Sequence, residues 1–147
     1  MKFRYQRRPT TPSKAHPKRY NVLRPIVPIR LINNHEYIDT DALIDSGSDD
    51  CIFWGELGEA IGLDITSGDE CEYKGLSGEK VKVYFHNITL EVGGHQYECY
   101  AGFSYETGFK EGILGQNGFF NLFTTIFDLS KETIELKQNT NGKETNR

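Results

Sequence analysis

Short runs of β-branched or alternating hydrophobic residues, separated by polar turns, occupy most of the chain. Residues 25–32 read as a strand, Asn33-Asn34 marks a turn, and residues 37–44 form the return strand. The last part of that return strand is fully apolar, which predicts that it enters the core. Further strands are predicted at residues 81–85, 88–92, 95–103, 124–128 and 133–136, with a Gly-Gly hairpin turn at 93–94.

Helical spacing is confined to two short stretches. Trp54, Leu57 and Ile61 fall on one face of a predicted helix, and Gly62 ends it. Residues 118–123 are predicted to form one or two helical turns. The whole pattern therefore predicts an all-β protein, a small closed or barrel-like domain with one or two short helices.

Size and composition agree with one globular domain. The chain has 147 residues, of which 37% are hydrophobic and 26% are charged. A chain of this length buries a core without help from disulfides or metals. No apolar run approaches the roughly 20 residues that cross a membrane. Residues 1–8 also lack the apolar centre of a signal peptide. These features predict a cytoplasmic protein with no membrane partner.

Three cysteines and four histidines offer little chemistry of their own. Cys51, Cys71 and Cys99 are odd in number and widely spaced, which does not indicate a disulfide framework. The cysteines and histidines also lack the spacing of zinc ligands. We therefore expect three reduced thiols and no metal site.

Charge divides the chain into a basic start and an acidic remainder. Residues 1–24 hold eight Lys and Arg and no acid, so they carry +8. The other 9 basic residues face all 21 acidic residues, which leaves −12 for residues 25–147. Three prolines and few aliphatic residues predict that 1–24 is a flexible arm. Such an arm can bind RNA, DNA or an acidic partner. The favoured alternative is a solvated segment that only offsets the acidic body.

The most informative segment delivers an aspartate from an apolar strand into a tight turn of small residues. Ala42-Leu43-Ile44 would hold the carboxylate of Asp45 on a rigid element. Gly47 lets the backbone approach that carboxylate and donate an N–H to it. The Ser46 hydroxyl is expected to bond to neighbouring backbone and lock the turn. An Asp-Ser-Gly triplet by itself is typical of ordinary β-turns, so a second feature is needed.

That second feature lies 70 residues later, in Gly112-Ile113-Leu114-Gly115. Placed side by side, the two strand ends resemble the core of the retropepsin-like aspartic proteases, in which an apolar-apolar-Gly strand supports the Asp-Ser-Gly or Asp-Thr-Gly loop. The run from Asp45 to Asp50 is similar to Asp-Thr-Gly-Ala-Asp-Asp of that family. Gly75 to Gly78 falls where the family has its glycine-rich flap. The likeness covers about residues 25–137, and its ending resembles the cellular microbial relatives of retroviral proteases.

The resemblance implies an all-β acid-protease (retropepsin) fold and an aspartic endopeptidase that works as a homodimer on extended peptides. Each subunit would supply Asp45, Ser46 and Gly47 to the catalytic site, with no cofactor. The residues implied to bind substrate are Ser48, Asp49, Asp50, Gly75, Leu76, Ser77, Gly78 and Ile113. Plainer alternatives stay open: residues 75–78 as an ordinary turn, Ile113 as core, and Asp50 as a solvated acid.

Two departures from the family pattern affect dimer closure. Retroviral members usually have an arginine where this chain has Gln116, and that arginine pairs with the aspartate matching Asp49. An Asp49–Gln116 hydrogen bond is the expected, weaker substitute. Residues 138–147 are polar throughout and predict a disordered tail, so a terminal sheet must end near Leu136 or be built another way.

Two other functions stay open. The first is a retropepsin-like module that binds peptides or assembles with partners without cutting. The second is a nucleic-acid-associated protein that binds through its basic arm, which the sequence does not favour.

Overall fold

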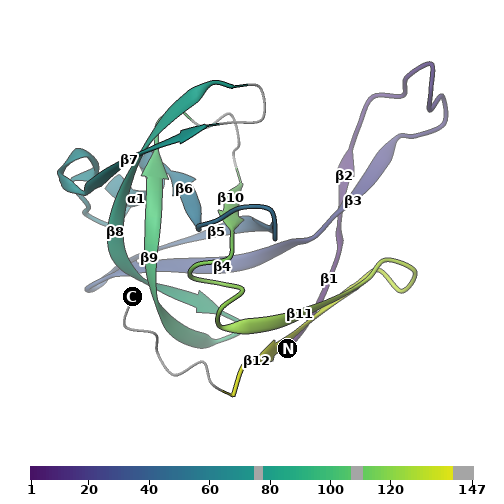
Figure 1. Ribbon diagram of the computed structural model, residues 1–147. Coiled ribbons are helices and arrows are strands. Elements are labelled where there is room, and N and C mark those ends of the chain that lie inside the picture. Colours follow the sequence, from purple (N-terminus) through teal and green to yellow (C-terminus); the bar gives the residue numbers. More distant parts are fainter. Residues whose placement is uncertain (75–77, 107–110, 141–147) are drawn as a thin grey trace.

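The computed structural model describes residues 1–74, 78–106 and 111–140. Strands dominate these residues and only one short α-helix occurs among them, so the all-β prediction is confirmed (Figure 1). No helix within these ranges is long and apolar enough to cross a membrane. The elements are β1 (Lys2–Arg4), β2 (Gln6–Pro9), β3 (Asn21–Arg24), β4 (Ile26–Asn33), β5 (Glu36–Ile44), β6 (Ile52–Trp54), α1 (Gly55–Ala60), a 3-10 turn (Ile65–Ser67), β7 (Asp69–Lys74), β8 (Lys80–Val92), β9 (His95–Ser104), β10 (Gly112–Leu114), β11 (Phe123–Asp128) and β12 (Thr133–Gln138).

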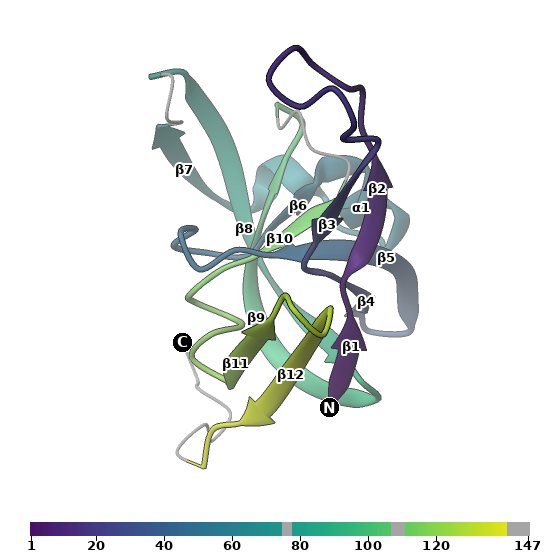
Figure 2. The ribbon, with the colours of Figure 1, turned by 90° about the vertical axis from the view of Figure 1, so that its right-hand side faces the viewer.

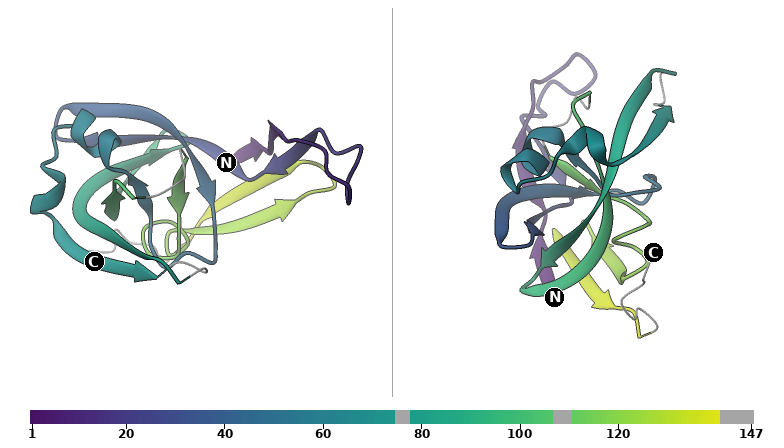
Figure 3. Two further views of the ribbon diagram at one scale, coloured as in Figure 1. Left: turned by 90° about the horizontal axis from the view of Figure 1, so that it is seen from above. Right: turned by 90° about the vertical axis from the view of Figure 1, so that its left-hand side faces the viewer.

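A seven-stranded sheet in the order β4-β5-β10-β6-β9-β8-β7 forms the body of the molecule. β4 also pairs with β8, from Arg30 opposite Glu91 to Ile32 opposite Thr89, so the strand pairing returns to β4. The strands curve around a common interior (Figure 3). Burial alternates along β8 with the period of two that a half-buried strand requires. The buried interior includes Val27, Leu31, Ala42, Phe53, Leu90, Phe103, Leu114 and Phe119.

The predicted hairpins and the first helix form where they were expected. Asn34 has a φ of 54° in the turn between β4 and β5, and Gly93 and Gly94 turn the chain between β8 and β9. Helix α1 ends before Gly62, whose φ of 84° suits glycine. Gly58 of α1 packs so closely on Ile65 that an added Cβ would lie 2.4 Å from its Cδ1 atom.

Two local predictions were wrong. β8 is one strand rather than two, because His86 and Asn87 stay in the ladder opposite Ala101 and Tyr100. Residues 118–122 form turns rather than a helix. Gly118 has a φ of 104°, which a right-handed helix does not permit.

The N-terminal segment differs most from expectation. Instead of a flexible arm, residues 1–24 contain three strands. β1 pairs with β12, which places Phe3 opposite the buried Ile134, and the Met1 ammonium donates to the Leu136 carbonyl at 3.0 Å. β12 also pairs with β11, so the two ends of the chain share a three-stranded sheet (Figure 2).

The remaining segment, β2 with β3, forms a hairpin beside this sheet. At the other end of the chain, β12 continues to Gln138, and the backbone N–H of Asn139 donates to the Leu122 carbonyl at 2.8 Å. The predicted tail at 138–147 therefore begins with ordered residues, while 141–147 lie outside the described residues.

Candidate active site

Parallel pairing of β5 and β10 brings the two sequence motifs together. Leu43 lies opposite Ile113 and Ile44 lies opposite Leu114, so both strands end at the same edge of the sheet. Beyond that edge the backbone N–H of Asp45 donates to the Leu114 carbonyl at 3.0 Å. The adjacency that the resemblance implied is therefore present in the structure.

The turn after Asp45 is held by its own backbone. The N–H of Gly47 donates to Oδ1 of Asp45 at 2.9 Å, as the motif predicted. The Ser48 hydroxyl donates to the Asp50 carbonyl at 2.8 Å. The expected role of the Ser46 hydroxyl was wrong: Ser46 is exposed, and its hydroxyl makes no hydrogen bond among the described residues. The Ser48 hydroxyl makes the side-chain bond within the loop instead.

Gln116 crosses between the loops at a different place from the expected one. Its side-chain amide donates to the Ser46 carbonyl at 3.0 Å rather than to Asp49. Its backbone N–H donates to the Ser48 carbonyl at 2.9 Å, and this register directs the side chain back toward Ser46. The Asp49 side chain is exposed and has no partner in the described part of the chain.

Gly115 allows the two loops to approach. A Cβ at this position would lie 2.2 Å from the carbonyl oxygen of Asp50 and 2.7 Å from that of Ser48. These neighbours are backbone atoms and have little freedom to move away. Glycine at this position of the second motif is therefore a steric requirement of the Asp45 loop.

Asp50 is not merely a solvated acid. Its carboxylate accepts hydrogen bonds from the Tyr73 hydroxyl and, at 3.2 Å, from the side-chain amide of Asn117. Tyr73 belongs to β7, so this carboxylate ties the β7–β8 hairpin to the Asp45 loop. Sequence reasoning missed both partners. Asn117 could have been suspected because it follows the second motif, but no sequence signal singles out Tyr73.

The implied flap falls partly outside the described residues. β7 and β8 pair as far as Lys74 opposite Lys80, and the implied flap lies between these two residues in the sequence (Figure 1). Gly75, Leu76 and Ser77 are not described. Gly78 is exposed and has a φ of 85° with no atom within 4 Å of an added Cβ.

A cavity of about 200 Å³ opens beside the two strands that lead to the loop. Leu43 and Ile113 line it together, and both are half-buried, so Ile113 is not purely a core residue. Arg8, Arg24, Ile26 and Glu111 complete the lining. An apolar hollow adjoining an exposed carboxylate loop is a suitable place for a hydrophobic side chain of a ligand.

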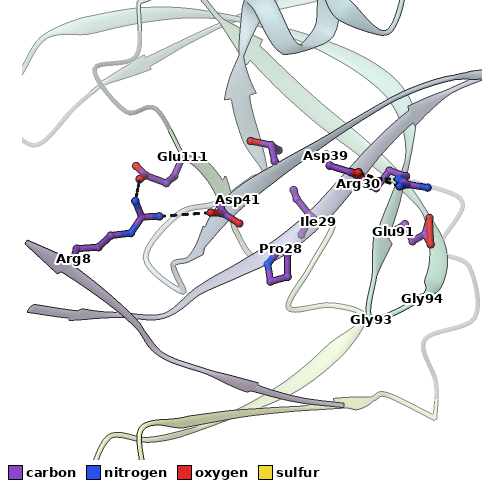
Figure 4. A pocket seen from close by; sticks show the side chains of 11 residues that line it. Arg8, Pro28, Ile29, Arg30, Asp39, Asp41, Glu91, Gly93, Gly94 and Glu111 are labelled. Atoms are coloured by element: carbon purple, nitrogen blue, oxygen red, sulfur yellow. Dashed lines mark hydrogen bonds and ion pairs between the residues drawn. The ribbon is translucent and has the colours of Figure 1, made fainter.

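A larger groove of about 860 Å³ contains none of the residues of the Asp45 loop (Figure 4). Ion pairs occupy much of it. Arg30 donates to Asp39 at 2.6 and 3.0 Å, and these bonds hold the pKa of Asp39 below its usual value. Arg8 contacts Glu111 at 3.1 Å and Asp41 at 3.7 Å. The groove is therefore larger but less suited to the predicted chemistry.

The cysteines do not add a nucleophile to the site. Cys51 and Cys99 are buried, Cys71 is exposed, and all three are free. A hydrogen bond with Cys51 and burial together raise the pKa of the Cys99 thiol well above its usual value. A neutral buried thiol is a weak nucleophile. In the described ranges no cluster of His, Cys, Asp or Glu is arranged to hold a metal ion.

No protein-family model matches the chain, and no curated protein matches it. Among solved structures, the EIAV protease in complex with an inhibitor is similar, with a TM-score of 0.48 and 16% sequence identity. The similarity covers 63% of this chain and 82% of the EIAV protease chain. At this TM-score the likeness decides nothing about the site, which rests on its own residues.

Proposed function

We infer that the protein is an aspartic endopeptidase of the retropepsin type and acts as a homodimer. The observation that carries this proposal is the arrangement around Asp45. Its carboxylate stands at the end of an apolar strand, accepts the Gly47 N–H at 2.9 Å, and lies beside the parallel strand that ends in Gly115. A loop built so closely around one carboxylate has an evident use if that carboxylate reacts.

The proposed chemistry needs two such carboxylates. Two adjacent carboxyl groups cannot both ionise easily, so the pair holds one proton over a range of acidic pH. The ionised member takes a proton from a bridging water, and the water oxygen attacks the peptide carbonyl. The protonated member donates to the carbonyl oxygen. The tetrahedral intermediate then breaks its C–N bond, and the leaving amine takes up the proton that the first carboxylate removed from water. The other carboxylate takes a proton back from the intermediate's hydroxyl group as the carbonyl reforms. The residues themselves do this work, without a metal or organic cofactor.

The chain contains one Asp-Ser-Gly triplet, so the second carboxylate has to come from a second copy. We propose that the second copy docks along β11. β11 is the outer strand of its three-stranded sheet. Ile126 and Phe127 on β11 are 41% and 43% exposed, and Leu129 in the following turn is 60% exposed. A strand edge that has no partner strand among the described residues and carries exposed apolar side chains is suited to pairing with its symmetry mate.

Substrate contacts follow from the same geometry. The cavity beside Leu43 and Ile113 would take a hydrophobic side chain next to the scissile bond. Asp49 has an unengaged carboxylate to accept a backbone N–H of an extended peptide. Ser48 and Asp50 already make hydrogen bonds within the site. They would therefore stabilise the loop rather than contact the peptide directly. Residues 75–78 would cover the peptide as a lid.

The proposal is tested by mass-spectrometric digestion of a mixed peptide library between about pH 4 and about pH 7, the acidic range of a shared-proton dyad. Native protein is compared with Asp45→Asn and with Glu36→Gln, an exposed acid outside the site. We expect cleavage by the native protein and by Glu36→Gln, and none by Asp45→Asn. If a preparation that is dimeric by light scattering cuts nothing, the function is peptide binding or assembly without catalysis.

A further inference from the structure

The most basic part of the molecule is an ordered hairpin rather than a loose arm. β2 and β3 pair from Gln6 opposite Arg24 to Pro9 opposite Asn21, and the N–H of Thr10 extends the ladder to the Tyr20 carbonyl at 2.8 Å. Further backbone bonds between Ser13, His16 and Arg19 fold its tip. The tip extends away from the seven-stranded sheet (Figures 1 and 3).

Charge is segregated along this hairpin. Residues 6–24 contain six Lys and Arg and no acid. Two of the three arginines at the root are engaged, Arg7 with Glu132 at 2.7 Å and Arg8 with Glu111 and Asp41, and Arg24 lies opposite Gln6. The cations of the tip, Lys14, Lys18 and Arg19, are exposed and have no ion pair with any described residue. A segment that served only to offset the acidic body would place these cations against it.

We propose that the β2–β3 hairpin is a docking arm for single-stranded nucleic acid, with phosphates on Lys14, Lys18 and Arg19 and a base on Tyr20. The Tyr20 ring follows directly after this cluster and is 64% exposed. Cations that track the backbone, combined with an aromatic ring on which a base stacks, are the means by which proteins hold single strands.

The exposed Tyr20 ring favours this ligand over an acidic peptide, because a nucleic-acid base stacks on an aromatic face and a carboxylate does not. The two cavities described above include hairpin residues only at its root, Arg8 and Arg24. The remainder of the chain, residues 25–147, carries −12 and repels a polyanion. A projecting arm keeps a nucleic acid away from that field while still binding it. Duplexes suit the tip less well, because their stacked bases leave no face for Tyr20.

The test measures binding of the full chain to labelled single-stranded RNA and DNA of one sequence, by fluorescence anisotropy over a range of salt concentrations. Three phosphate contacts predict a slope of about −2 for log K against log salt on a single strand. The variant Lys14→Gln/Lys18→Gln/Arg19→Gln removes these contacts and should bring the slope of log K against log salt close to zero. Tyr20→Ala should weaken single-strand binding about fivefold. A difference in affinity between the RNA and the DNA oligonucleotide would identify the preferred sugar.

A matched control separates position from net charge. Lys80→Gln/Lys131→Gln/Lys137→Gln also takes the chain from −4 to −7 but alters the body. We expect this control to keep the native affinity and slope. The proposal is overturned if the native chain does not bind, if the two triple variants lose affinity equally, or if a duplex or poly-glutamate binds as tightly as the single strand. All substituted tip residues are exposed, and circular dichroism checks that the fold is retained.

Discussion

The backbone of Gly115 lies against two carbonyl oxygens of the Asp45 loop, and this contact determines how closely the two halves of the site approach. An added methyl group would have to displace the backbone of Asp50 or of Ser48. Movement of Ser48 would also disturb the bond from the Gln116 N–H to the Ser48 carbonyl, which is 2.9 Å long. Position 115 therefore couples stability to the geometry of the candidate catalytic residue.

Gly115→Ala should lower the free energy of unfolding by about 3 kcal/mol, the upper range for overpacking a tight site. It should also reduce any peptidase activity, because the Asp45 loop shifts. Gly94→Ala is the control: nothing lies within 4 Å of its added Cβ, and only its φ of 81° is unfavourable. That strain costs about 1 kcal/mol. Urea unfolding of both variants measures the difference, and equal costs would contradict the steric role of Gly115.

Residue-level prediction succeeded where the chemistry is local. The bond from the Gly47 N–H to Asp45 was predicted because it lies within one turn. The partners of Asp50 were not identified, since Tyr73 reaches it from a strand 23 residues away. Gln116 was assigned the wrong acceptor because its side-chain direction depends on the register of two loops. Such registers are decided by packing and not by composition.

At the level of elements, β7 is attached to the Asp45 loop through one side chain. Tyr73 donates its hydroxyl proton to the carboxylate of Asp50, and its ring stacks on Phe85 of β8. The bond joins the hairpin on which the proposed lid lies to the loop that holds the proposed catalytic group. Motion of the hairpin relative to the loop is therefore restrained at this point.

Tyr73→Phe keeps the ring contact and removes only the hydrogen bond. Loss of a bond to a carboxylate should cost roughly 2 kcal/mol of stability. If the proposed function holds, kcat/KM for a peptide substrate should fall about tenfold or more, because the lid and the loop are no longer aligned. Tyr84→Phe, on the same hairpin but without a bond to the loop, provides the control. Unchanged kinetics in Tyr73→Phe would show that this bond has no role in positioning.

Prediction of elements failed at the start of the chain, where β1 pairs with the distant β12 and β2 pairs with the nearby β3. The sequence predicted β4, β5, β8, β9 and β10, whereas β6 and β7 were not predicted. Three pairings of the body join neighbouring strands, and the other four, β5–β10, β6–β10, β6–β9 and β4–β8, join distant segments. β1 was assigned to a flexible arm because residues 1–24 hold eight cations, three prolines and few aliphatic residues. Its stability comes from β12, whose residues follow about 130 positions later, with Lys2 opposite Glu135. No local pattern shows that such a partner exists.

At the level of the whole molecule, the sheet formed by the chain ends leaves one apolar edge open. β1 covers one side of β12, β11 covers the other, and the outer edge of β11 has no partner strand among the described residues. The exposed Ile126 and Phe127 lie on this strand. A symmetric dimer would bury these side chains and extend the sheet across the two-fold axis.

Ile126→Ser/Phe127→Ser should therefore weaken the dimer by at least about tenfold in dissociation constant, as expected for the apolar centre of an interface. Tyr37→Ser, which changes another exposed side chain far along the sequence, should leave the dimer intact. Sedimentation at several protein concentrations measures both. Asp45 is unchanged in the double variant. Its peptidase activity should therefore recover at high protein concentration, where mass action shifts the equilibrium back to the dimer. A native protein that cleaves peptides as a monomer would contradict both the edge contact and the shared dyad. A double variant that stays dimeric but inactive would instead locate the dimer contact elsewhere.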